Sequence, residues 1–309
     1  MRVPAPGRRA LLLGALVPAL GACATLPALT AAASTADGQA LLDAGAAAHG
    51  GAALAGVSDI SVSYAGTGWS GLVDRLQPEL VDASFRGGSE ERLLLRAGVV
   101  AQAHAGPAGR KQVMRRTAAG GQGSVVVRYN DAEVTGADRR SVNLRAGAAL
   151  VVDAYSLFLL GPMVLAGPWA LERSVVLALG EPERIRVDGA AHECDVLRVR
   201  VAPGMGFSEA DDLVLWLDKD ERLMRRIRFT LNGMEGTRGA IAETDAAGYV
   251  PYGGVRWPTR FVERLLRPLP AFVHEWRLRG LDLNRGLVPA DVSGPAFTGR
   301  AAPPATVWA

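Results

Sequence analysis

One stretch constrains the fold more than any other: residues 211–231, which read DDLVLWLDKDERLMRRIRFTL. Two runs of strand-forming residues, 213–217 and 222–231, flank a polar turn at 218–221, a pattern that indicates a β-hairpin. Both faces of the first run are apolar, so this part of the sheet must be covered on two sides. The chain must therefore build its core around an antiparallel sheet.

The rest of the chain repeats this pattern. Ile60, Val62 and Tyr64 alternate with serines and predict a half-buried strand. Glycine-rich breaks separate the apolar runs at a spacing typical of hairpins rather than of βαβ units. Further strands are predicted at 79–86, 91–103, 111–117, 124–129, 193–201, 239–247, 254–265 and 272–283.

A first helix is predicted over 35–48. Ser34 or Thr35 can cap its start, and the two glycines at 50 and 51 can end it. His49 would then lie at the C-terminal end, where a positive charge is favourable.

A second helix is predicted over 142–160, ended by the Gly-Pro pair at 161–162. Its apolar stretch is short and carries Asp153, so we expect it to pack into a concave sheet and not to span a membrane. It either fills that concavity or leaves an accessible cavity beside it. The following segment, PWALERSVVLAL, is predicted to continue as a short helix.

The N-terminus has the features of a secretory signal. Arg2, Arg8 and Arg9 precede a short apolar run, and the run ends in Leu-Gly-Ala-Cys at residues 20–23. These four residues resemble the bacterial lipobox, which implies a diacylglycerol group and palmitate-like acyl chains on Cys23 and cleavage before it. Ala24 follows the cysteine, and by the same resemblance this favours the periplasmic face of the outer membrane over the inner membrane. An ordinary signal peptide with an incidental cysteine is the alternative.

Composition excludes several classes of protein. The chain has 309 residues with 49% hydrophobic and 21% charged side chains, which is typical of a globular protein. The net charge of +3 is small and the arginines are spread along the chain, so we expect no nucleic-acid partner. Two cysteines, Cys23 and Cys194, cannot form a disulfide framework.

The densest group of reactive side chains is His192-Glu193-Cys194-Asp195. His192 and Cys194 would share one face of a strand, but a zinc site needs further ligands that no spacing provides. The acidic residues 211–212 and 218–221 lack the calcium-loop pattern and are interpreted as a strand start and a turn. We therefore expect no metal, no cofactor and no enzymatic activity, with a periplasmic hydrolase of unrecognised type as an alternative.

Three segments carry a family resemblance. They are ADDLVLWLDKDERLMRRIRF at 210–229, GGVRWPTRFVERL at 253–265 and AYSLFLLGPMVL at 154–165. Together with the order of predicted elements they resemble the LolA-like superfamily of periplasmic lipoprotein carriers and lipid-binding lipoproteins. The resemblance implies an α+β fold: a curved antiparallel β half-barrel with helices closing the concave face over an apolar cavity.

The resemblance also implies a function. We expect an outer-membrane-anchored lipoprotein that binds a lipid acyl chain or other hydrophobic ligand, with the 142–166 segment as a gate. The alternative is a structural or assembly lipoprotein that docks an envelope protein. The candidate cavity residues are Tyr155, Phe158, Leu159, Met163 and Arg225, the last either inside the cavity, paired with a carboxylate, or at a β-bulge or rim.

The predicted organisation has four parts. Residues 1–22 are a lipoprotein signal peptide, and 23–34 are the lipidated cysteine and a tether. Residues 35–285 form a single half-barrel domain, and 286–309 are an irregular C-terminal tail.

Overall fold

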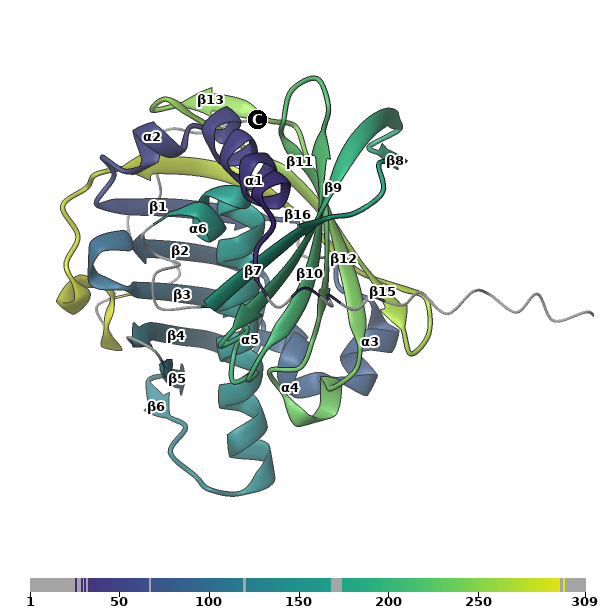
Figure 1. Ribbon diagram of the computed structural model, residues 1–309. Coiled ribbons are helices and arrows are strands. Elements are labelled where there is room, and N and C mark those ends of the chain that lie inside the picture. The colour runs from purple at the N-terminus through teal and green to yellow at the C-terminus, as the bar shows by residue number, and fades with distance from the viewer. Residues whose placement is uncertain are drawn as a thin grey trace, which may run out of the picture.

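The 211–231 hairpin forms as predicted and belongs to a large curved antiparallel sheet (Figure 1). β10 (Asp211–Asp218) pairs with β11 (Met224–Thr230) in the computed structural model. Both faces of β10 are covered, because Leu215 and Leu217 join the main core while Trp216 packs in a second apolar cluster on the opposite face. The structure describes residues 26, 29, 31, 33–66, 68–118, 121–167, 174–294 and 297.

The sheet has 14 strands over the described residues, in the order β6-β5-β4-β3-β2-β1-β16-β15-β12-β11-β10-β9-β7, with β8 also paired to β9. The C-terminal strand β16 therefore lies beside β1 and joins the two halves of the sheet. The remaining strands are β1 (Asp59–Ala65), β2 (Gly88–Leu94), β3 (Val99–Gly106), β4 (Gly109–Ala118), β5 (Gly121–Tyr129), β6 (Ala132–Glu133), β7 (Ser174–Leu179), β8 (Glu183–Val187), β9 (Ala190–Ala202), β12 (Ile241–Ala247), β15 (Arg260–Arg267) and β16 (Ala271–Leu283). A separate two-stranded sheet holds β13 (Val250–Tyr252) and β14 (Val255–Trp257).

The helices lie mainly on the concave side of the sheet (Figure 1). They are α1 (Ala36–His49), α2 (Gly51–Leu54), α3 (Gly71–Leu76), α4 (Pro78–Val81), α5 (Arg139–Leu160) and α6 (Pro162–Ala166). Short 3-10 turns are η1 (Ala83–Phe85), η2 (Leu95–Ala97), η4 (Glu235–Thr237) and η5 (Pro289–Val292). The predicted α+β half-barrel with helices closing its concave face is confirmed.

The long helix α5 begins at a cap and ends at a glycine. The side chain of Asp138 accepts a hydrogen bond from the Ser141 amide at 3.0 Å, which satisfies one free N–H of the first turn. Gly161 follows the helix with φ 53°, a conformation that favours glycine. By length and hydropathy α5 could cross a membrane, but 67% of its apolar window is buried inside the protein. It is the core helix that the sequence predicts.

The two faces of the sheet differ in character. On the concave face Ile60, Val62 and Tyr64 are buried in the main core, as their alternation predicts. On the convex face of β11 and β12, charged side chains form ion pairs instead, with Arg226 contacting Asp245 at 2.6 Å. This alternation lets one sheet present an apolar interior and a polar exterior.

Four local predictions are wrong. The strand predicted at 254–265 is two strands, β14 and β15, which belong to different sheets and are separated at Pro258 and Thr259. Residues 79–86 form α4 and η1 rather than a strand, since Pro78 suits the first turn of a helix. The strand predicted at 91–103 is two strands separated by η2, where Gly98 takes a left-handed φ of 59°. The segment after α6 holds strand β7 instead of a helix, because Ser174–Leu179 pairs with β9.

The first helix and the terminal segments are placed as follows. α1 starts after Thr35, whose hydroxyl accepts the Gly38 amide at 3.1 Å, and ends at Gly50 as predicted. Within the predicted tether Leu29 is buried, and within the predicted tail Phe297 packs against the convex face of β2 and β3. Cys23 and the predicted signal peptide lie outside the described residues.

Candidate functional site

Helix α5 runs through the interior of the half-barrel without filling it. Two cavities remain on two different faces of this helix, one of about 490 Å³ and one of about 230 Å³. Asp153, Leu157 and Leu160 line the larger, and Val151, Ala154 and Phe158 line the smaller. This spacing follows from the 3.6-residue turn, since residues three and four apart share a helix face.

The larger cavity lies between the two flanks of the sheet. Residues of β2, η2 and β3 line one side, and residues of β7, β9 and β10 line the other. Its lining is mainly apolar, but Asp153 contributes a carboxylate that accepts two hydrogen bonds from Arg115, at 3.2 and 3.1 Å. This buried ion pair joins α5 to β4 and fixes the position of the helix.

The smaller cavity lies between α5, the α3–α4 segment and strands β11, β12, β15 and β16. Its wall is almost wholly apolar. Ala154, Ala240 and Ala242 are buried there, and their small side chains leave the space that larger residues would fill. Leu76 and Leu269, which line its outer end, are 53% and 42% exposed.

The α3–α4 segment that covers this cavity is held in place by buried charges. Asp82, directly after α4, contacts the Lys111 ammonium group of β4 at 2.8 Å and accepts a hydrogen bond from the Tyr129 hydroxyl at 2.5 Å. Burial and the neighbouring Arg86 lower the pKa of Lys111 to about 8, although Asp82 opposes this shift. Long-range contacts therefore anchor the cover to the sheet.

Polar groups gather at the inner end of the smaller cavity. His274 of β16 is fully buried and stacks on Trp69, with ring centroids 3.8 Å apart and planes at 13°. Its Nε2 atom lies 2.7 Å from the Glu263 carboxylate of β15. His274 also stacks on Trp276, which in turn stacks on Tyr155 of α5 at 4.9 Å.

The candidate cavity residues on α5 and α6 lie in different surroundings. Tyr155 and Phe158 line the smaller cavity. Leu159 and Met163 are each 1% exposed within the main core and line neither cavity.

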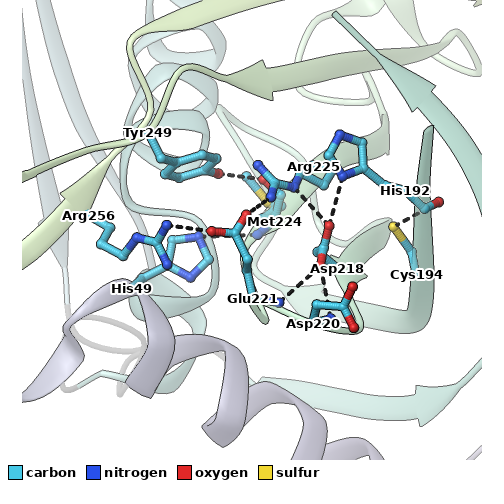
Figure 2. Close-up of polar contacts among 10 residues, drawn as sticks. All are labelled: His49, His192, Cys194, Asp218, Asp220, Glu221, Met224, Arg225, Tyr249 and Arg256. Atoms are coloured by element: carbon cyan, nitrogen blue, oxygen red, sulfur yellow. Dashed lines mark hydrogen bonds and ion pairs between the residues drawn. The ribbon is translucent and has the colours of Figure 1, made fainter. Parts of the chain in front are cut away.

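Arg225 lines neither cavity and lies in a polar cluster at the turn of the β10–β11 hairpin (Figure 2). The register shifts there, so that Trp216 faces Arg226 and Leu217 faces Met224, and Arg225 is the extra residue of a β-bulge. Its guanidinium group contacts Asp218 at 3.3 Å and also pairs with Glu221.

Asp218 organises that hairpin turn. One carboxylate oxygen accepts the amides of Asp220 and Glu221 at 2.9 and 3.0 Å, and the other lies 2.8 Å from the His192 ring (Figure 2). Burial opposes the charged form, but these hydrogen bonds and Arg225 together lower the pKa of Asp218 below its ordinary value. The interpretation of residues 218–221 as a turn is consistent with this geometry.

His49 corrects one prediction. It lies at the end of α1 as expected, but it is buried, donates from Nδ1 to the Gly45 carbonyl at 2.7 Å and accepts the Met224 amide at Nε2 at 3.3 Å. Burial lowers its pKa to about 4, so the ring is neutral at pH 7. The favourable positive charge expected at this helix end is absent, because burial disfavours the charged ring and Nε2 must keep its lone pair to accept the Met224 amide.

The His192–Asp195 group does not form a reactive centre. Cys194 is fully buried among apolar residues, and its thiol lies 3.8 Å from the His192 carbonyl rather than from the imidazole (Figure 2). Burial and the Asp218 charge raise the pKa of the Cys194 thiol to about 12, and a protonated thiol is a poor nucleophile. Within the described part of the chain, no three His, Cys, Asp or Glu side chains converge on a metal position.

Sequence reasoning missed Trp69, Glu263 and His274. The strand alternation at 260–267 and 271–283 carried a usable signal, because Glu263 and His274 occupy inward positions and face each other in register. An acid and a histidine on the apolar face of paired strands are exceptions that need a reason. Trp69 carried no such signal, since its contact depends on how the α3 segment folds over the sheet.

Comparison with known proteins finds likeness only at the level of structure. No family model matches the sequence, and no curated protein matches it. Among solved structures, a DUF1329 family protein of Desulfovibrio piger has 12% identity and a TM-score of 0.47, with 84% of this chain and 98% of that chain covered. A LolA superfamily protein of Nitrosomonas europaea has 9% identity and a TM-score of 0.43, with 84% and 99% covered.

A third structure, a domain from Vibrio parahaemolyticus named for outer membrane lipoprotein sorting, has 12% identity and a TM-score of 0.38, with 83% and 96% covered. The structures to which this chain is similar thus include one from the LolA superfamily, which the sequence resemblance named.

Proposed function

We propose that this chain is a cell-envelope lipoprotein that holds an acyl chain or another hydrophobic ligand inside its half-barrel. The observation that carries the proposal is that α5, although strongly apolar, leaves two mainly apolar cavities open beside it. Ligand sites in proteins are typically apolar cavities of about 300–1,000 Å³ with few polar groups. The larger cavity is of this size, and the smaller suits one short chain or part of a long one.

The energetics favour such a ligand. Each buried methylene contributes about 0.8 kcal/mol, so a chain of ten methylenes gains about 8 kcal/mol before the entropic costs of binding. A route into the smaller cavity is provided by exposed apolar side chains at its outer end, Leu76 of α3 and Leu269 of the β15–β16 turn. Leu72 and Phe272 are also exposed, at 48% and 45%.

The expected gate over residues 142–166 remains part of the proposal. α5 forms a wall of both cavities, so a shift of this helix would change both volumes together. The Arg115–Asp153 pair would resist that shift, and it makes α5 a fixed partition unless the pair opens.

The anchor belongs to the same proposal. We expect Cys23 to carry a diacylglycerol group and acyl chains, which hold the domain on the periplasmic face of the outer membrane, with the inner membrane as the alternative. Radiolabelled palmitate should enter the full chain and not the Cys23→Ala variant. Separation of the two membranes on a density gradient then assigns the location, and label in the Cys23→Ala variant would contradict the anchor.

Ligand binding is tested with an apolar fluorescent probe, N-phenylnaphthylamine, and the Cys23→Ala chain purified without detergent. Ala154→Leu narrows the smaller cavity and Ser156→Leu narrows the larger one. Val142→Leu is the matched control, because Val142 lies on the same helix but is exposed. We expect probe binding to fall in at least one cavity variant and to persist in the control; no binding, or equal binding in all variants, would contradict the proposal.

A second candidate function is docking of an envelope protein. It is favoured by the same four exposed apolar side chains, Leu72, Leu76, Leu269 and Phe272, because they belong to elements that border one cavity and an exposed apolar patch often marks an interaction site. Under this alternative, Phe272→Asp would abolish capture of the partner and leave probe binding unchanged.

A further inference from the structure

The inner end of the smaller cavity contains hydrogen-bonding groups that the fold itself leaves unused. The Trp69 Nε1 and His274 Nδ1 atoms are buried, and neither has a hydrogen-bond partner among the described residues. Both residues line the cavity, and His274 is fully buried. Buried polar atoms are almost always satisfied in folded proteins, so two adjacent exceptions beside an apolar cavity indicate a site for a ligand group.

The chemistry of the two atoms differs. An indole nitrogen can only donate, so Trp69 offers one N–H. A carboxylate can only accept, so the 2.7 Å contact with Glu263 assigns the His274 proton to Nε2 and leaves a lone pair on Nδ1. Burial lowers the pKa of His274 despite the nearby Glu263 carboxylate, which keeps the ring neutral at pH 7. The site therefore presents one donor and one acceptor.

Charge narrows the class of ligand further. Among the described residues that line this cavity, Glu263 is the one charged side chain, and it is an acid. The Arg86 guanidinium lies 5.0 Å from the Trp69 ring centroid but does not line the cavity. An anionic headgroup would therefore meet a carboxylate and a histidine lone pair in a site of low dielectric constant, which is unfavourable.

We propose that the smaller cavity binds a neutral amphiphile whose hydroxyl or primary amide head bonds to Trp69 and His274 while its alkyl chain fills the apolar remainder. Such a head both donates and accepts, so it satisfies the two orphan atoms at once. An ester accepts only, and a carboxylate accepts only and carries charge. The inference rests on the proposed function, since it names the ligand class of one of the two cavities.

The test compares four probes that share an eight-carbon skeleton: 1-octanol, methyl octanoate, octanoate and octylammonium. Each displaces N-phenylnaphthylamine from the Cys23→Ala chain in the Ser156→Leu background, where the larger cavity is narrowed. One hydrogen bond contributes about 0.5–1.5 kcal/mol, and a buried group left unpaired costs about 1–3 kcal/mol. We therefore expect 1-octanol to displace the probe at about tenfold lower concentration than methyl octanoate, and at lower concentration still than octanoate.

A conservative variant locates the effect. Trp69→Phe keeps an aromatic ring against His274 and removes the N–H, so it should weaken 1-octanol binding about fivefold and retain N-phenylnaphthylamine binding. The indole ¹H–¹⁵N signal that is missing in Trp69→Phe identifies Trp69 in the parent spectrum. That signal should shift downfield on addition of 1-octanol, which a purely structural role for Trp69 would not produce.

The outcomes separate the two proposals. If the fluorescent probe does not bind, the proposed function fails. If the probe binds but methyl octanoate, octanoate or octylammonium competes as well as 1-octanol, the function stands and the neutral-amphiphile inference is overturned. If no indole ¹H–¹⁵N signal shifts downfield at saturating 1-octanol, the inference is overturned too, and this result does not depend on the folding of Trp69→Phe.

Discussion

The sign of the stability change in Ala154→Leu shows most directly whether the smaller cavity is empty. Ala154 lies on α5, is 6% exposed and lines this cavity of about 230 Å³. Leucine adds three carbon atoms, and each buried methylene contributes about 0.8 kcal/mol, so the free energy of unfolding should rise by about 2 kcal/mol. If the space were already filled, the same change would overpack the core and cost about 1–3 kcal/mol.

The matched control is Ala148→Leu, on the same helix. Ala148 is 1% exposed and packs tightly against Val113 and Val127 of β4 and β5. Ala148 lines neither of the two cavities, so we expect a loss of about 1–3 kcal/mol. The two variants make the same chemical change in the same helix and differ only in the space that receives it.

The assay is urea denaturation of delipidated protein, with tryptophan fluorescence as the signal that reports unfolding. Delipidation is needed because a bound ligand stabilises the native state and would hide the effect of filling the empty cavity. The midpoint should move up for Ala154→Leu and down for Ala148→Leu with unchanged slopes. A loss of stability in Ala154→Leu equal to that in Ala148→Leu would refute the cavity.

Four further outcomes follow from the described contacts. The native pKa of His49, about 4, lies below its ordinary value of 6.5, so between pH 6.5 and pH 4 the native state binds fewer protons than the unfolded state. The free energy of unfolding should therefore fall by about 3 kcal/mol as the pH drops from 6.5 to 4. His49→Gln should flatten this part of a pH–denaturation profile. Burial raises the pKa of Glu91 from 4.5 to about 7, so its contribution to the free energy of unfolding is full below pH 4.5 and is lost as the pH rises through 7. Glu91→Gln should therefore be more stable than the parent protein at pH 8. Arg225→Met should cost about 3 kcal/mol in chemical denaturation because it leaves the Asp218 carboxylate without its cation, while probe affinity stays constant. Cys194 should resist a thiol reagent in native Cys23→Ala protein and react once urea unfolds it, and rapid native labelling would contradict its burial.

Local patterns were sufficient to predict the main features of the architecture. The apolar run 213–217 followed by a polar turn indicated a hairpin, the longer apolar run of 142–160 indicated a helix, and both formed. The error at 79–86 has a local cause, the Pro78 that begins α4, and also a long-range one. Asp82 follows α4 with a left-handed φ of 53° and is held by Lys111 and Tyr129, which are distant in the sequence.

The candidate site was less accessible to sequence reasoning. Which faces of α5 border empty space depends on the side chains that strands and helices distant in the sequence bring against it. Trp69 and His274 stack on each other but lie far apart in the sequence, so no local spacing could indicate their contact. His49 shows the same limit, because its position at a helix end was predictable but its burial against Met224 was not.

Native mass spectrometry of the Cys23→Ala chain, isolated from a bacterial periplasm without detergent, decides whether the half-barrel holds a ligand. We expect a bound lipid or other apolar molecule that dissociates on collisional activation, with lower occupancy in Ala154→Leu or Ser156→Leu than in Val142→Leu. Correctly folded protein that carries no such molecule in repeated preparations, or equal occupancy in all three variants, would contradict it.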